Sequence, residues 1–137
     1  MGFIMVCTYE EYLKRPKAIT FAKMQTIHTE MIAEIGTDVD ALELYDELIK
    51  IATRYATIRA NWLLLSREEK NEQDSGRTSC HNSVIIHFNM LARYLKQQGR
   101  TAAWRDELGY EEDDPNNRKA IGDFACYFAF VNGINAR

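Results

Sequence analysis

The chain has 137 residues, 46% of them hydrophobic and 27% charged, which is the length and composition of one ordinary globular domain over 1–137. Its net charge of −3 provides no overall positive potential that would attract nucleic acid. No apolar run approaches the length of a membrane span. Three widely spaced cysteines without a Cys-x-x-Cys pair argue against a zinc knuckle and a disulfide framework, so we expect a reduced, cytoplasmic protein.

The N-terminal part of the chain carries clear helix start and stop signals. Thr8 and Glu11 form a capping box, which predicts a short first helix. Pro16 suits the first turn of a second helix over about 17–35, and Gly36 ends it.

The middle of the chain predicts the longest helix, followed by a break. Thr37 or Asp38 caps a helix that runs to about residue 65. A second capping box over 66–69 starts a short polar helix, and the polar segment 71–77 predicts a loop.

Two further main helices, with a short one between them, are predicted after this loop. Thr78 or Ser79 caps a helix that Gly99 ends, and 101–108 predicts one or two helical turns. An Asp-Pro pair then starts the last helix, over about 115–132. Because strand-like alternation is absent, the sequence predicts an all-α fold, a compact bundle of about four main helices plus short accessory helices.

The longest predicted helix has an apolar arc wider than a surface helix needs. One seam holds Tyr45, Leu48, Ala52, Tyr55, Ala56, Trp62 and Leu63, and a second holds Leu44, Ile51, Ile58 and Leu65. The last helix is apolar around most of its circumference. Each of these helices is therefore expected to lie either at the centre of its own bundle or in an interface with a partner.

Four polar side chains fall on apolar helical faces: His28, Arg59, His81 and Asp123. A buried guanidinium is costly unless it is paired, so Arg59 predicts a nearby carboxylate or a bound anion. One interpretation is a satisfied structural network within the core. A second is a pocket between helices that binds a small molecule or an anion. A third is a different helix phase, which would leave these side chains exposed.

Other chemical signals are weaker. The segment Arg77-Thr78-Ser79 before a helix predicts an anion-binding site, although ordinary N-capping explains the same residues. Cys80 near a helix N-terminus predicts either a thiol of lowered pKa or a buried structural cysteine. No histidine has a carboxylate three residues before it, so we expect no metal site. We assign no catalytic residue and no cofactor from the sequence.

Acidic pairs at helical spacing give one enzymatic alternative. All-α nucleotide pyrophosphohydrolases gather Mg²⁺ with Glu-x-x-Glu and Glu-x-x-Asp pairs. Glu43 and Asp46 match the second pair, and Glu30 and Glu34 match the first loosely. A solvated polar face explains these residues equally well.

The stretch RTSCHNSVIIHFNMLAR over 77–93, with the later AWRDELG and GDFACYFAFVN, resembles a small uncharacterised family of bacterial all-helical proteins. The resemblance implies a bacterial, cytoplasmic origin and an accessory protein of a mobile element. It carries over no site residues.

These observations together favour a non-enzymatic interaction or regulatory protein that self-associates as a homodimer, with another protein as a further candidate partner. The alternative is a small-molecule or anion-binding protein, or a hydrolase, that uses the pocket formed by His28, Arg59, His81 and Asp123. The sequence alone does not decide whether the protein is an enzyme.

Overall fold

The computed structural model describes residues 19–62, 64–108 and 115–132. Its helices in chain order are α2 (Phe21–Ile35), α3 (Val39–Trp62), α4 (Arg67–Gln97), α5 (Ala103–Asp106) and α6 (Pro115–Val131). No strand occurs in these ranges, which confirms the predicted all-α class. The predicted helix at Thr8 and the expected role of Pro16 lie outside the described residues.

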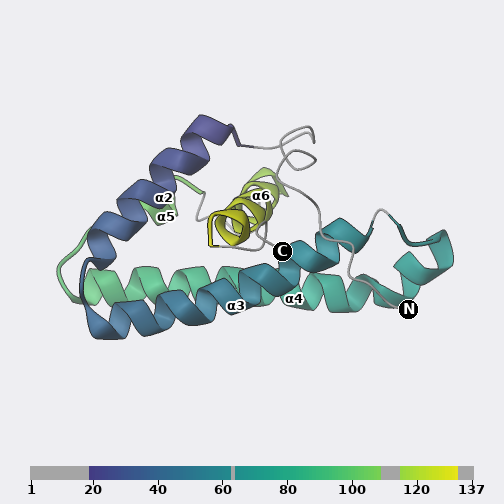
Figure 1. Ribbon diagram of the computed structural model, residues 1–137, viewed down its shortest axis with the longest axis horizontal. Coiled ribbons are helices and arrows are strands. Elements are labelled where there is room, and N and C mark those ends of the chain that lie inside the picture. The colour runs from purple at the N-terminus through teal and green to yellow at the C-terminus, as the bar shows by residue number, and fades with distance from the viewer. Residues whose placement is uncertain (1–18, 63, 109–114, 133–137) are drawn as a thin grey trace.

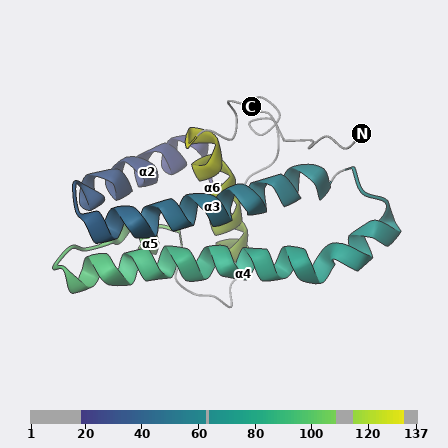
Figure 2. The same cartoon turned by 60° about the horizontal axis from the view of Figure 1, so that its bottom comes forward.

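The two longest helices, α3 and α4, lie side by side and run antiparallel (Figure 1). The shorter helices α2, α5 and α6 all lie on one side of this pair, and α6 crosses it. Figure 2 turns the opposite side of the pair toward the viewer. We call that side the outer face.

The helix signals read from the sequence are largely confirmed. Gly36 follows α2 with φ of +51°, a backbone conformation that favours glycine. Asp38 Oδ1 accepts the Ala41 N–H at the start of α3. Ser66 and Glu69 form the reciprocal capping box that starts α4.

The core is densest around α6. Every residue from 121 to 130 is buried, so the apolar circumference of this helix is satisfied within the chain. Phe128 shows why: its ring packs edge-on against His28 of α2, Tyr45 of α3 and Phe88 of α4. One side chain thus joins four helices.

The wide apolar arc of α3 is also used within the chain. Its first seam is buried at Leu48, Ala52 and Tyr55, where α3 packs on α4 and α6. Its second seam is half-buried at Leu44 and Ile51, which pack against the edge of the core. The first seam therefore follows from a central position in the bundle, whereas the second seam keeps part of its surface exposed.

The predicted loop over 71–77 is wrong. These residues lie inside α4, whose 31 residues make it longer than the 24 of α3. Six of the seven residues are exposed, so their polar character reflects the absence of a covering element, and Glu72, Gln73 and Arg77 are good helix formers. An ion pair between Asp74 and Arg77 and the stacking of Arg77 on Trp62, 4.5 Å from the ring centroid, support the helix there.

Across the described ranges, none of the helices combines the length and apolar character that crossing a membrane requires.

Candidate functional site

Arg59, near the end of α3, is the centre of a polar cluster in the core. Its Nη1 donates to Tyr55 Oη at 3.1 Å, and its Nη2 lies 3.6 Å from Asp123 Oδ1 on α6. The Asp123 side chain is 3% exposed and that of Arg59 is 25% exposed. The carboxylate that the sequence demanded for Arg59 is therefore supplied by the chain itself, as one interpretation anticipated.

His81 joins the same cluster through Tyr55. The two rings lie 5.2 Å apart between centroids, with His81 contributed by α4. Both approach the backbone of α6 at Gly122, where an added Cβ would lie 3.0 Å from Tyr55 Oη and 3.2 Å from His81 Nε2. We call Tyr55, Arg59, His81, Gly122 and Asp123 the polar junction, because it fastens α3, α4 and α6 together.

The charge state of the polar junction follows from its surroundings. Burial disfavours the charged form of Arg59, but Cys126, Tyr55 and Asp123 outweigh that effect and raise the pKa of the guanidinium. Burial also disfavours the charged form of Tyr55 and so raises the pKa of its hydroxyl, although the nearby Arg59 cation acts in the opposite direction. At neutral pH the junction therefore holds a cationic Arg59 beside a neutral phenol.

His28 does not belong to the polar junction. Its Nε2 lies 3.2 Å from Tyr45 Oη, and Tyr45 donates in turn to Asn132 Oδ1 at 3.1 Å. Tyr45 and Tyr55 are ten residues apart on α3, which corresponds to about 15 Å along the helix. The predicted four-residue pocket is therefore two separate clusters.

The buried position of His28 predicts a pH-dependent stability. Burial lowers the pKa of His28 below its ordinary 6.5, so between the two pKa values the unfolded chain binds more protons than the folded one. The contribution of His28 is complete above pH 6.5 and declines as the pH falls through the lowered pKa. Urea unfolding at a series of pH values should show a free energy of unfolding that decreases on acidification. His28→Gln keeps a donor for Tyr45 but cannot titrate, and should reduce this slope. Equal slopes in the two proteins would contradict the assignment.

The predicted anion site at Arg77, Thr78 and Ser79 loses the structural premise on which it rested. It required a helix N-terminus with free N–H groups, whereas these residues lie in the interior of α4, where the backbone N–H groups bond within the helix. Arg77 is occupied by Asp74 and by the Trp62 ring.

The cysteine near His81 has a structural environment. Cys80 is buried, and burial raises the pKa of its thiol, against a smaller opposing effect of Arg54. The thiol also lies mid-helix, far from the N-terminus of α4. The interpretation of Cys80 as a structural cysteine fits this environment.

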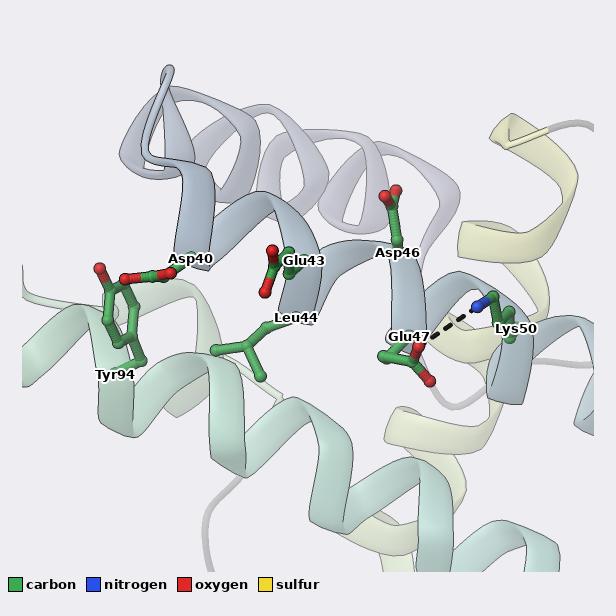
Figure 3. A pocket seen from close by; sticks show the side chains of 7 residues that line it. All are labelled: Asp40, Glu43, Leu44, Asp46, Glu47, Lys50 and Tyr94. Atoms are coloured by element: carbon green, nitrogen blue, oxygen red, sulfur yellow. Dashed lines mark hydrogen bonds and ion pairs between the residues drawn. The ribbon is translucent and has the colours of Figure 1, made fainter.

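An acidic hollow of about 550 Å³ lies on the outer face, between the first half of α3 and the end of α4 (Figure 3). Its lining residues are Asp40, Glu43, Leu44, Asp46, Glu47, Lys50 and Tyr94. Leu44 points toward α4 and forms an apolar part of the lining, while Glu47 pairs with Lys50 at 3.2 Å. The hollow is open to solvent.

The acidic pairs do not converge on a metal site. In the part of the chain that the structure describes, no group of three or more His, Cys, Asp or Glu side chains could hold a metal ion. Glu34 is occupied: its carboxylate accepts from Trp104 Nε1 at 2.8 Å and Thr101 Oγ1 at 3.0 Å. Glu30 shares a hydrogen bond with Glu107, which raises its pKa. The Mg²⁺-dependent hydrolase interpretation therefore finds no support in these residues.

Sequence reasoning missed Arg105, whose side chain is almost completely buried. Its Nε donates to Asn89 Oδ1 at 2.6 Å, which ties α5 to α4. Arg105 lies in a predicted helix of only one or two turns, which is too short for an apolar stripe to reveal its burial. The role of Gly122 was also missed, because Gly76 interrupts a helix in the same way with nothing within 4 Å of an added Cβ, so a glycine in a helical pattern does not by itself reveal a close approach.

Comparison with known proteins gives no relative. No protein-family model, no curated protein and no solved structure matches the chain.

Proposed function

We propose that this protein is a non-enzymatic interaction protein that self-associates, with the outer face of the α3–α4 pair as its contact surface. The resemblance to bacterial helical proteins stays a prediction. In line with it, we propose that the protein acts in a bacterial cytoplasm.

The observation that carries the proposal is the apolar content of the outer face. Ile86 and Met90 on α4 are 56% and 40% exposed. They lie about 80° and 40° around α4 from Tyr94, which lines the hollow on this face. Leu44, Ile51 and Tyr94 are only half-buried. No described helix covers this side of the pair (Figure 2). Grouped apolar side chains in the open favour association, because burial against a partner removes them from water.

The ligand-binding alternative has less support from the geometry. Arg59 already has a carboxylate and a phenol as partners, so its charge does not demand a bound anion. His28 lies in a different cluster. A pocket that needs all four predicted residues is therefore not supported by their positions.

Sedimentation equilibrium tests the proposal. The wild-type protein should be a dimer at micromolar concentration, and Met90→Lys should shift it toward the monomer, because a lysine ammonium resists burial in an apolar contact. Ile32→Lys is the matched control: Ile32 is 43% exposed but lies on α2, and its replacement should leave the dimer intact. A wild-type protein that remains monomeric up to millimolar concentration would refute self-association.

A further inference from the structure

The exposed charges of α3 follow a pattern with its own symmetry. Glu43, Glu47, Lys50 and Arg54 are all exposed. At 100° per residue they fall within about 60° of one another around the helix. Their side of α3 is the outer face, because Glu43, Glu47 and Lys50 line the hollow there. Two acidic residues thus precede two basic residues along one stripe.

The stripe is complementary to itself. Glu47 and Lys50 lie at equal distances from the point between Leu48 and Ile49, and so do Glu43 and Arg54. When two such helices pack antiparallel about a two-fold axis at this point, Glu43 meets Arg54 and Glu47 meets Lys50 of the other copy. A two-fold interface requires this kind of self-complementary surface.

The same axis meets α4 beside its exposed apolar residues. Asp38 bonds to Tyr94 at one end of the pair, and Tyr55 stacks with His81 farther along. These two contacts fix which positions of the antiparallel helices lie opposite one another. Interpolation between them places Ile86 of α4 opposite the midpoint of the charged stripe on α3. The symmetry centre of the charges therefore coincides with exposed apolar surface, and Met90 follows one helical turn later.

From this coincidence we infer that the occupant of the outer face is a second copy of the chain, with α3 antiparallel to the α3 of the other copy. Glu43 pairs with Arg54, and Glu47 with Lys50, across the interface. The guanidinium of Arg54 then reaches the acidic hollow, whose lining includes Glu43. This inference rests on the proposed self-association and adds its geometry. A partner with a uniformly basic surface would leave Lys50 and Arg54 opposed by like charges.

Paired charge reversals test the geometry. Lys50→Glu with Arg54→Glu makes the stripe entirely acidic, and Glu43→Lys with Glu47→Lys makes it entirely basic. Each double variant alone should dissociate, with the dimer Kd raised at least about tenfold, because like charges oppose one another at four places. A mixture of the two variants should form a heterodimer, which native mass spectrometry resolves by mass.

The heterodimer is the decisive readout, since it also shows that both variants are folded. Arg67→Glu with Lys96→Glu is the control: both residues are exposed on α4, about 80° or more around the helix from Ile86 and Met90, and this variant changes the net charge by the same amount as the acidic variant. Its dimer should persist. Circular dichroism and thermal melting check that each variant is folded before its mass is interpreted.

The outcomes separate the two proposals. A monomeric wild-type protein would overturn self-association itself. A wild-type dimer that persists in both double variants, or dissociated variants that form no heterodimer on mixing, would overturn the antiparallel α3 geometry while leaving self-association in place.

Discussion

Replacing Gly122 with leucine is expected to cost the fold about 3 kcal/mol, since it forces side-chain atoms into a fully packed site. Even a single Cβ at this position meets Tyr55 Oη at 3.0 Å and His81 Nε2 at 3.2 Å. Tyr55 Oη also accepts the hydrogen bond from Arg59, so a shift of the Tyr55 ring disturbs that bond. The larger side chain should therefore separate α6 from the α3–α4 pair.

The chain offers a matched control in Gly76, which lies in the interior of α4 with nothing within 4 Å of an added Cβ. Gly76→Leu should stabilise the protein by up to about 1 kcal/mol, because leucine is the better helix former. Chemical denaturation of both variants measures the difference. Similar free energies of unfolding for the two would contradict the close approach at Gly122.

Arg59→Met should destabilise the protein by about 2–3 kcal/mol. The loss arises mainly at Asp123, which stays buried after its cationic neighbour is removed. The figure is smaller than for a completely buried pair, because the Arg59 side chain keeps one quarter of its surface exposed. The Tyr55 hydroxyl also loses the hydrogen bond from Arg59.

Arg93→Met is the control for this substitution, because Arg93 is exposed on α4 and its replacement should change stability by less than about 0.5 kcal/mol. Urea unfolding of both variants measures the effect. If Arg59→Met is as stable as the wild-type protein, the structural role of Arg59 is wrong and the ligand-binding interpretation gains ground.

Helix class and helix ends could be predicted from the sequence because they depend on local signals. Capping boxes, C-terminal glycines and an Asp-Pro pair act within a few residues, and Asp38, Ser66 and Gly36 all occupy the expected positions. The loop over 71–77 failed for an informative reason. The segment is polar because no other element covers it, which is a tertiary property. The same polar pattern was interpreted as the absence of a helix.

The partners of the polar residues required the three-dimensional arrangement. Helical periodicity placed Arg59 and Asp123 on apolar faces, and their proximity could be proposed as one possibility. The separation of His28 from Arg59 could not be foreseen, because it depends on where α2 and α6 cross α3. Tyr55 was assigned to the apolar seam, since periodicity does not distinguish a tyrosine that packs from one that also bonds through its hydroxyl.

The N-terminal segment of α4, residues 67–79, has a consequence for how the chain tolerates changes in length. From 67 to 79 the helix has no buried residue, and the core begins only at Cys80. Side chains introduced in this segment would be exposed to solvent on most sides of the helix. Homologous chains could therefore gain or lose two helical turns, seven residues, at this end without altering the register of the core. The tip of the α3–α4 hairpin is accordingly the place where natural length variation, or an inserted reporter peptide, should be accommodated most readily.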